Sequence, residues 1–329
     1  IGGPDCTAGH DVARANTTIL GADGIEANRS RGDKVSSMVK GRFRCSPAIG
    51  FYNFPDETRH PLLRERSSTL GNHMKFDDGH LANPAFRLAA LDQEFILSEE
   101  MRGTRFLLEY TKAETLLRAA GIESTVVVFG SARVTPDGID GPPVRPTTSW
   151  GHWYDEARRF GHLVSTRRGA LSPDGGRHSN VIATGGGGGI MEAANRGACE
   201  AGAPSIGVNI QLPFEPRPNP YTTPALTLNF HYFALRKMHL AQRAAALVAF
   251  PGGFGTLDEL FEVLTLIQTG KAPRVPVVCF GRAYWQRLVN FDVFLEERMI
   301  SPEDMELIHF ADTAEEAWTA LIKSGLRVP

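Results

Sequence analysis

Several features that would point to a membrane or nucleic-acid protein are missing from this 329-residue sequence. No hydrophobic run approaches the roughly 18 residues that a membrane-spanning helix needs. The charges nearly cancel, because 35 Lys and Arg stand against 37 Asp and Glu, which leaves a net charge of -2. A chain without a charge excess has no general attraction for nucleic acid or for an anionic membrane. We therefore expect neither of these as a partner.

Cysteine is also scarce, and its few positions are far apart. Cys6, Cys45, Cys199 and Cys279 form no C-x-x-C pair, which argues against both a disulfide framework and a thiolate zinc site. The ten histidines form no cluster with metal-ligand spacing. The N-terminus lacks the charged and then apolar layout of a signal peptide. We expect a cytoplasmic protein without a metal site.

The chain changes character twice along its length. Residues 1–80 mix Gly, Asn, Ser, Arg and Asp with few periodic apolar positions, which predicts a largely irregular segment. Asn83 and Pro84 are typical of the first positions of a helix, and apolar residues follow at helical spacing through Ile96. A second helical stretch ends at Gly121, so residues 81–121 are predicted to form a helical extension.

Residues 122–329 alternate strand-like and helix-like segments. Apolar runs of the kind that are buried on both faces of a parallel sheet lie at 125–129, 181–183, 205–209, 246–250 and 275–280. Amphipathic segments between or after them lie at 153–165, 191–201, 231–244, 257–269 and 284–299. This order predicts an α/β fold with a Rossmann-like, doubly wound parallel sheet, to which the helical extension is added. The Pro-rich insert at 135–148 is predicted to be a surface loop.

Glycine-rich turns follow three of the predicted strands, at the sheet edge where such folds bind ligands. They are Gly130-Ser-Ala-Arg133, the run from Thr184 to Ile190, and Pro251-Gly-Gly-Phe-Gly-Thr256. Glycine lets the backbone approach an anion closely, and a helix that starts there presents free N–H groups. A tight turn is the alternative for either long loop alone, whereas the two together favour a phosphorylated ligand.

The spacing of residues within these turns limits the class of phosphorylated ligand. Neither long loop has the G-x-x-x-x-G-K-[ST] pattern that binds a triphosphate with magnesium. The 185–189 run is not followed by the third glycine of G-x-G-x-x-G, and the next strand ends in Asn209-Ile-Gln211 without a ribose-binding acid. A nucleoside monophosphate therefore fits better than NAD or ATP. We predict phosphate contacts from Gly186, Gly187, Gly252, Gly253, Gly255, Thr256 and Ser131.

Two charged residues are candidates for chemistry. Glu259 lies in the first turns of a helix that starts on the glycine loop, where a carboxylate is placed to stabilise a ribosyl cation and to orient water. Its spacing from Thr256 is equally that of a capping box. Arg236 is placed either to bind phosphate or to orient Glu259, and a solvated basic helix end is its alternative.

Arg236-Lys237 followed by Pro-Gly-Gly-Phe-Gly-Thr-Leu-Asp-Glu259 resembles the signature of the LOG (Lonely Guy) family. The similarity extends over roughly residues 122–325 and includes Phe129-Gly-Ser131 and the segment from Gly185 to Asn195. The resemblance implies a Rossmann-type phosphoribohydrolase that releases a free base and ribose 5-phosphate from AMP or a cytokinin riboside monophosphate. It implies Arg236 and Glu259 as the catalytic pair and Gly252 to Thr256 as the phosphate cradle.

The resemblance also bears on the base, the cofactor and the assembly. We predict that Glu192, Asn195 and Lys237 contact the base or the ribose. No organic cofactor is required, and the lysine decarboxylase label often attached to the family has no support in a PLP-lysine context. The helical extension and the longer first crossover resemble the longer bacterial branch, which leaves base specificity open. A homodimer is expected.

Some alternatives stay open at this stage. A non-catalytic nucleotide sensor or carrier on the same fold is the rival function, although it has no need of an Arg–Glu pair. His231 and His239 lie near Arg236, and packing or solvent exposure is the simpler role for each. Tyr232, Phe233 and Phe254 are placed to stack on a base, with core packing as the alternative.

Overall fold

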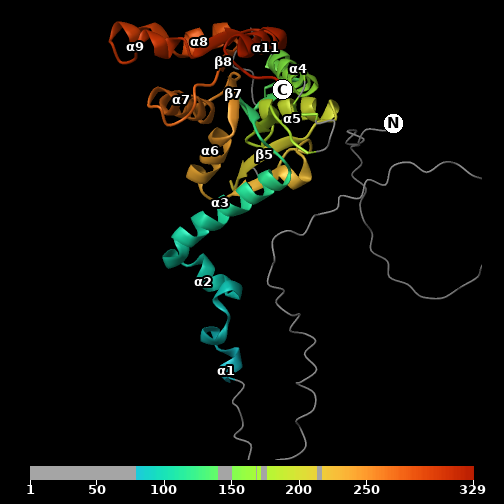
Figure 1. The fold of residues 1–329 in the computed structure, drawn as a ribbon, viewed down its shortest axis with the longest axis vertical. Coiled ribbons are helices and arrows are strands. Elements are labelled where there is room, and N and C mark those ends of the chain that lie inside the picture. The colour runs from blue at the N-terminus through green and yellow to red at the C-terminus, as the bar shows by residue number, and fades with distance from the viewer. Residues whose placement is uncertain (1–78, 140–149, 168, 172–175, 213–216) are drawn as a thin grey trace, which may run out of the picture. The chain divides into compact units, whose positions relative to one another are not determined.

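The computed structural model describes residues 79–139, 150–167, 169–171, 176–212 and 217–329 (Figure 1). The predicted irregular segment up to residue 78, and positions 140–148 of the predicted surface loop, lie outside the described residues. Residues 79–88 form a unit separate from residues 89–329, and each is described by itself.

A seven-stranded parallel sheet forms the centre of residues 89–329 (Figure 1). Its order is β6-β5-β4-β1-β7-β8-β9, and every neighbouring pair is parallel. The strands are β1 (Thr125–Phe129), β4 (Val181–Thr184), β5 (Ser205–Ile210), β6 (Thr227–Phe230), β7 (Ala244–Ala249), β8 (Val277–Phe280) and β9 (Ile308–Ala311). The short β2 (Val134–Thr135) and β3 (Gly138–Ile139) pair separately as a hairpin.

Helices cover both faces of the sheet, because successive side chains of each strand point to opposite faces. Val127 and Phe129 of β1 belong to one buried cluster, whereas Val126 and Val128 belong to the other. The first cluster is closed by α3 (Arg102–Ala119), α6 (Phe233–Gln242), α7 (Phe254–Gln268) and α8 (Arg282–Leu288). The second is closed by α4 (Trp150–Thr166), α5 (Ile190–Glu200) and α11 (Ala314–Lys323). The doubly wound α/β fold is therefore confirmed.

Each strand predicted from an apolar run is present, but β6 and β9 were missed. Both lie at the edges of the sheet, where a strand has a partner on one side only. Their sequences are short and carry polar residues, so they lack the continuous apolar run of a central strand. The helix predicted at 284–299 is also wrong, because Val289 and Asn290 are extended and separate α8 from α9 (Phe291–Glu296). A further short helix, α10 (Pro302–Met305), precedes β9.

The helical extension is more broken than the sequence predicts. Asn83 does cap its turn, since its side chain accepts a hydrogen bond from the Ala85 amide at 2.9 Å. Asp92 has an extended backbone and caps the next helix, and the extended Ser98 ends that helix. The elements are α1 (Gly79–Ala82), η3 (Pro84–Phe86), η4 (Ala89–Leu91), α2 (Gln93–Leu97) and η5 (Glu99–Met101). One continuous helix through Ile96 is therefore wrong, whereas α3 ends as predicted before Gly121, whose φ is +66°.

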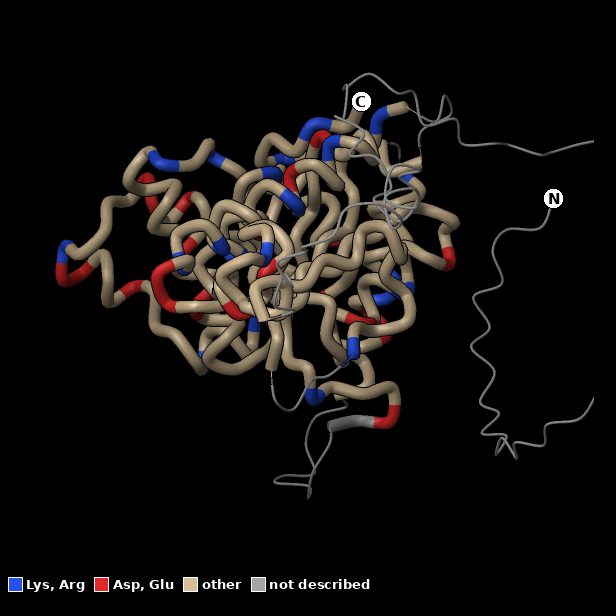
Figure 2. The backbone as a smooth tube through the Cα atoms, turned by 90° about the horizontal axis from the view of Figure 1, so that it is seen from below, with Lys and Arg blue, Asp and Glu red and all other residues tan. Residues whose placement is uncertain are grey.

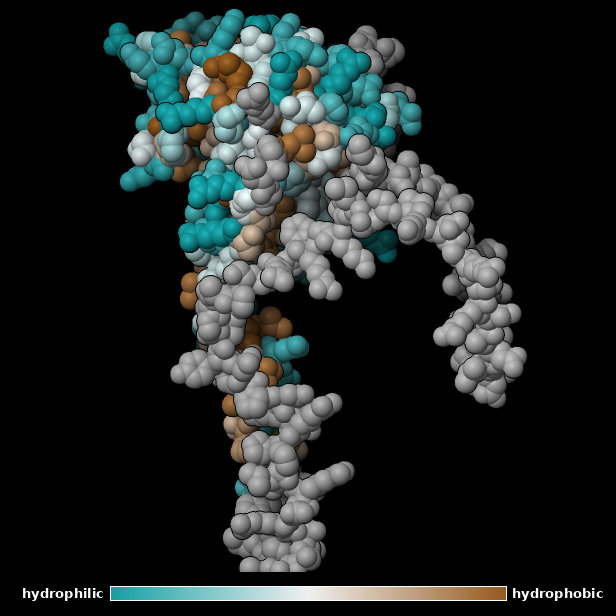
Figure 3. Space-filling model, turned by 45° about the vertical axis from the view of Figure 1, so that its right-hand side comes forward, coloured by the Kyte–Doolittle hydropathy of each residue, from teal (hydrophilic) through white to brown (hydrophobic). Residues whose placement is uncertain are grey.

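Hydrophobic side chains lie exposed along this extension (Figure 3). Leu91, Leu97 and Leu107 are exposed by 75%, 69% and 63%. Positive and negative residues are interspersed over the described backbone (Figure 2). None of the described helices combines the length and hydrophobicity that crossing a bilayer requires. The homodimer stays a prediction.

The described cysteines differ in state. Cys279 is a buried free thiol on β8, and burial raises its pKa to about 12. Cys199 is disulfide-bonded. The sequence argument against disulfides therefore does not hold for Cys199, because distance along the sequence does not limit distance in the fold.

Helices α4 and α5 cross at two glycines, which predicts a specific stability loss. A Cβ atom on Gly197 would lie 1.9 Å from the Arg158 carbonyl oxygen, and one on Gly161 would lie 2.2 Å from that of Ala194. Gly197→Ala must push two helix backbones apart, so we expect it to lower the free energy of unfolding by about 1–3 kcal/mol. Gly103→Ala in α3 is the matched control, because nothing lies within 4 Å of its Cβ position. Urea unfolding should show no loss for the control, and equal effects of both substitutions would contradict the prediction.

Candidate active site

A cavity of about 660 Å³ lies at the carboxyl ends of β1 and β7. From β1 the chain builds the sheet outward through β4, β5 and β6, and it then adds β7, β8 and β9 on the other side of β1. The strand order therefore reverses between β1 and β7. Open parallel sheets bind ligands at this switch point. The cavity is lined by segments 129–133 and 251–257 and by Trp150, Met191, Arg236, Glu259, Tyr284 and Leu288.

The N-terminus of α7 forms one wall of the cavity. Its N-cap is Gly253, which offers no side chain to bond the first N–H groups of the helix. The Thr256 residue is only 5% exposed, and its hydroxyl forms no hydrogen bond with any residue that the structure describes. Free helix amides and a hydroxyl without a hydrogen-bond partner at one wall suit an anionic group.

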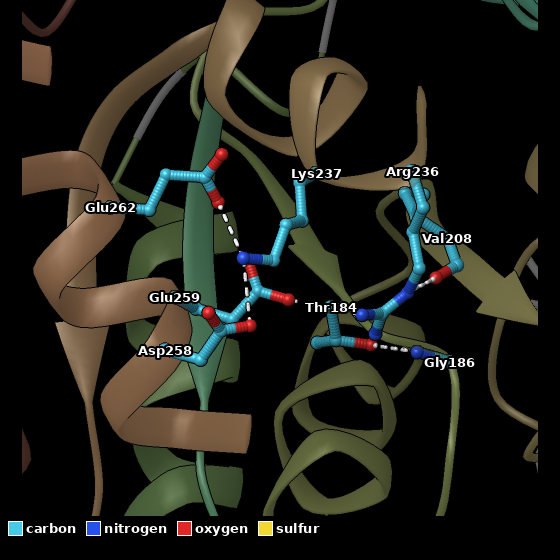
Figure 4. Close-up of polar contacts among 8 residues, drawn as sticks. All are labelled: Thr184, Gly186, Val208, Arg236, Lys237, Asp258, Glu259 and Glu262. Atoms are coloured by element: carbon cyan, nitrogen blue, oxygen red, sulfur yellow. Dashed lines mark hydrogen bonds and ion pairs between the residues drawn. The ribbon is translucent and has the colours of Figure 1, made fainter. Parts of the chain in front are cut away.

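Glu259 and Arg236 form a buried ion pair at the cavity (Figure 4). The Nη1 atom of Arg236 donates to Oε1 of Glu259 at 3.0 Å, and the side chains are exposed by only 11% and 7%. The Nε atom of Arg236 donates to the Val208 carbonyl at 2.9 Å, which ties the guanidinium to β5. Since Glu259 bonds to Arg236 and α7 begins at Gly253, the capping-box alternative for Glu259 is wrong.

The first glycine of the 185–189 run makes room for this pair. A Cβ atom on Gly185 would lie 2.3 Å from Nη2 of Arg236 and 2.8 Å from the Met191 sulfur. No larger residue fits at position 185 while the guanidinium holds this position. The loop therefore positions Arg236, a role that the sequence did not suggest.

The surroundings of Glu259 raise the pKa of its carboxyl group. Burial raises its pKa to about 7, against the lowering effect of the positive charges of Arg236 and Lys237. The carboxylates of Glu262 and Asp258 raise it further. A carboxyl group that titrates near neutrality in a cavity is typical of a catalytic acid or base.

Comparison with known proteins found similarity over part of the chain. A family model described as "Possible lysine decarboxylase" matches residues 191–321. The cytokinin riboside 5'-monophosphate phosphoribohydrolase LOG3 of Arabidopsis thaliana is 40% identical over 82 residues. A probable phosphoribohydrolase of the same kind, LOG4 of Oryza sativa subsp. japonica, is 28% identical over 152 residues. The chain is therefore similar to LOG phosphoribohydrolases over part of its length.

These matches cover only part of the chain and of its relatives. The alignment covers 25% of the chain and 38% of Arabidopsis LOG3, and 45% of the chain and 65% of rice LOG4. Among solved structures, the molybdenum cofactor carrier protein of Chlamydomonas reinhardtii is 20% identical with a TM-score of 0.37. That similarity covers 61% of this chain and 98% of the carrier protein.

The structure places part of the predicted site in the cavity. Its lining includes Ser131, Gly252, Gly253, Gly255, Thr256, Arg236 and Glu259. Lys237 does not line it; its Nζ atom pairs with Asp258 at 2.7 Å and with Glu262 at 3.2 Å (Figure 4). It therefore joins α6 to α7 beside the Arg236–Glu259 pair, and a base or ribose contact for Lys237 stays a prediction.

The other predicted contacts from the 185–195 segment lie outside the cavity lining. Gly186 donates its amide to the Thr184 hydroxyl at 2.9 Å, and a Cβ atom there would lie 2.3 Å from the Asn209 side chain. The Gly187 carbonyl accepts a hydrogen bond from Asn219 at 3.0 Å. These glycines serve packing and hydrogen bonding within the protein, so phosphate contacts from them stay predictions.

The two polar residues predicted to contact base or ribose are engaged with the protein. Asn195 is fully buried, and its side-chain oxygen accepts from Thr184 at 2.7 Å and from Asn219 at 3.0 Å. Glu192 accepts a hydrogen bond from the Tyr154 hydroxyl at 2.9 Å. Both side chains therefore hold α5 in place, whether or not they also meet a ligand.

The histidines and aromatics considered from the sequence fall into two groups. His239 is buried between Tyr110 and Phe230, and Tyr232 packs against Phe106 with its hydroxyl bonded by Arg105. Neither residue lines the cavity. Phe254 does line the cavity and is 92% exposed. Phe233, which is 52% exposed, and the exposed His231 lie outside the lining. Among the described residues no group of His, Cys, Asp and Glu is arranged to hold a metal ion.

Several residues of the lining carried no predicted role, among them Arg133, Trp150 and Tyr284. Arg133 and Tyr284 each lie a few residues beyond the carboxyl end of a strand, β1 and β8, so the rule that found the glycine loops also reaches them. The Tyr284 hydroxyl donates to the Gly252 carbonyl, and this hydrogen bond holds the backbone of the glycine loop in place. Trp150 carried no such signal, because it follows the Pro-rich insert.

Proposed function

We propose that this chain hydrolyses the N-glycosidic bond of a nucleoside 5'-monophosphate and releases the free base and ribose 5-phosphate. The observation that carries the proposal is the buried Arg236–Glu259 pair beside the open N-terminus of α7. A phosphate on the helix N-terminus brings the sugar toward Glu259, in the second turn of the same helix. AMP and cytokinin riboside monophosphates, as in the names of the plant relatives, are the substrate class that we propose.

The chemistry follows from charge placed where the sugar becomes cationic. As the bond from C1' to the base nitrogen breaks, its electron pair leaves with the base and the ribosyl group gains positive charge. The Glu259 carboxylate stabilises that charge and accepts a proton from the water that attacks C1'. Arg236 holds the carboxylate in place through its bonds to Glu259 and to Val208. The departing base takes up a proton, so water is divided between the two products.

The aromatic part of the cavity lining suits a flat base. Trp150 and Leu288 line the cavity together with Tyr284, and Trp153 packs edge-on against both aromatic rings. An aromatic wall binds a purine through stacking and burial without selecting its substituents. We therefore propose tolerance of substituted adenines.

A panel of nucleoside 5'-monophosphates, with free bases separated by chromatography, tests the proposal. Base release from AMP or an N6-substituted AMP supports it. Binding by calorimetry without base release from any member would instead identify a nucleotide sensor or carrier. No binding and no release across the panel would overturn both.

The pKa of Glu259 predicts the pH profile. The carboxylate is the active form, and burial raises its pKa to about 7. Below that pH the group is protonated, so kcat/KM should fall about tenfold for each unit below pH 6 and level off above pH 8. Lys237→Met removes a charge that lowers this pKa, so its profile should move to higher pH. A wild-type profile that is flat between pH 5.5 and 8 would contradict the assignment.

A further inference from the structure

The phosphate of the proposed substrate needs a positive charge that the catalytic pair does not supply. A phosphate monoester carries about -1.5 to -2 charges at pH 7. Among the residues that the structure describes, the lining of the cavity contains three charged side chains, which are Arg133, Arg236 and Glu259. Because Arg236 is paired with Glu259, the charge of those two residues cancels within the protein.

The guanidinium of Arg236 is committed to its present position. Its Nε atom bonds to the Val208 carbonyl, its Nη1 atom bonds to Glu259, and its Nη2 atom lies against the backbone of Gly185. Its positive charge is balanced by the carboxylate of Glu259, the group that it orients (Figure 4). Phosphate binding and orientation of the carboxylate therefore call for two different cations.

Arg133 is tied by its backbone to the cradle. The Ser131 amide donates to the Pro251 carbonyl at 3.0 Å, and the Arg133 amide donates to the Ser131 hydroxyl at 3.1 Å. A Cβ atom on Gly252 would lie 3.1 Å from the Ser131 nitrogen, so the two turns are in close contact. Arg133 thus extends from a turn fixed against the loop that opens α7.

The side chain of Arg133 is available for a ligand. It lines the cavity, is exposed, and forms no ion pair with any residue in the described part of the chain. The Thr256 hydroxyl, in the first turn of α7, has no hydrogen-bond partner among those residues either. A phosphate between these turns would receive the Arg133 guanidinium, the Thr256 hydroxyl and the first amides of α7.

We propose that Arg133 is the residue that binds the 5'-phosphate by charge, and that Arg236 acts on Glu259 without touching the phosphate. The proposal rests on the proposed function for the identity of the ligand. It divides the two cavity arginines by task, so that one selects phosphorylated substrates and the other serves the reaction at C1'.

Calorimetric titration with ribose 5-phosphate, a probe that needs no turnover, tests this division. We expect Arg133→Met to raise its Kd about 10- to 100-fold, since a charge-assisted hydrogen bond to an anion is lost. Arg133→Lys keeps a positive charge but not the paired N–H donors of a guanidinium, so it should lose less affinity for ribose 5-phosphate. Arg274→Met replaces an exposed arginine on the loop before β8, outside the cavity lining, and this variant should bind as the wild type does. Thermal melting shows whether each variant is folded.

Kinetics with AMP and adenosine give an independent readout. Arg133→Met should raise KM for AMP in parallel with the Kd of ribose 5-phosphate, leave kcat within about threefold, and leave any adenosine turnover unchanged. A loss of kcat at unchanged KM, or equal loss for AMP and adenosine, would overturn the proposal. An unchanged Kd in Arg133→Met would overturn it as well.

The proposed function and this inference can fail separately. If wild-type protein binds ribose 5-phosphate but cleaves no nucleotide, the hydrolase proposal fails while the comparison of Kd values still decides the role of Arg133. If wild-type protein cleaves AMP and Arg133→Met binds ribose 5-phosphate equally well, only the role of Arg133 fails. If wild-type protein does not bind ribose 5-phosphate, the phosphate site itself is refuted.

Discussion

Replacing Glu259 with Gln should reduce base release from AMP about 10³-fold, the largest effect that the structure predicts for a single substitution. Glutamine has nearly the same shape and still accepts the hydrogen bond from Arg236 that Glu259 accepts at 3.0 Å. It carries no negative charge to stabilise a ribosyl cation and takes no proton from water. The loss should therefore fall on kcat, with KM for AMP nearly unchanged. Single-turnover assays with chromatographic detection of adenine measure it.

A matched substitution separates this effect from a general one. Glu296→Gln in α9 removes an exposed carboxylate outside the cavity lining and should keep wild-type kcat and KM. The Glu259→Gln variant should also bind ribose 5-phosphate with wild-type Kd, because the cradle is intact. Turnover of Glu259→Gln within tenfold of the wild type would remove Glu259 from the mechanism, since no other carboxylate lines the cavity among the described residues.

The fold could be predicted where the sequence pattern is dictated by full burial. The central strands β1 and β4 have both faces covered, so their apolar runs are continuous, and the glycine turns follow at the ligand-binding edge. The edge strands β6 and β9 carry no such constraint and were missed. The break between α8 and α9 depends on two extended residues that interrupt an otherwise helical apolar pattern.

The candidate site could be predicted where one segment contributes several groups. The Pro251 to Glu259 segment gave the cradle and Glu259 together, because a helix that starts on a loop fixes the spacing of both. The sequence could not show that Gly185 makes room for Arg236, since a glycine-rich run looks the same whether an anion or a side chain lies against it. Trp150 was missed because tertiary packing alone brings it to the cavity.

Removing Arg236 should have the second-largest effect on kcat. The pH dependence of this effect tests whether Arg236 acts on Glu259 while Arg133 binds the phosphate. Arg236→Met leaves the Glu259 carboxylate buried at 7% exposure without its nearest cation. Because Arg236 lowers the pKa of Glu259, its loss should raise that pKa above its present value of about 7. At pH 7 most of the carboxyl would then be protonated as well as poorly oriented. We expect kcat to fall about 10²- to 10³-fold at pH 7, as judged from adenine release.

The pH dependence and the double variant distinguish this explanation from a loss of phosphate binding. Part of the activity of Arg236→Met should return as the pH is raised toward 9, because the carboxylate reforms, whereas lost phosphate binding would not recover. Arg236→Met with Glu259→Gln should be about as slow as Glu259→Gln alone, since an arginine that acts through Glu259 has nothing to act on once that group is neutral. The Kd of ribose 5-phosphate should stay at the wild-type value in Arg236→Met, because Arg133 is the residue placed to bind the phosphate. A Kd that rises with the loss of Arg236 would show that its guanidinium leaves Glu259 for the phosphate when substrate binds.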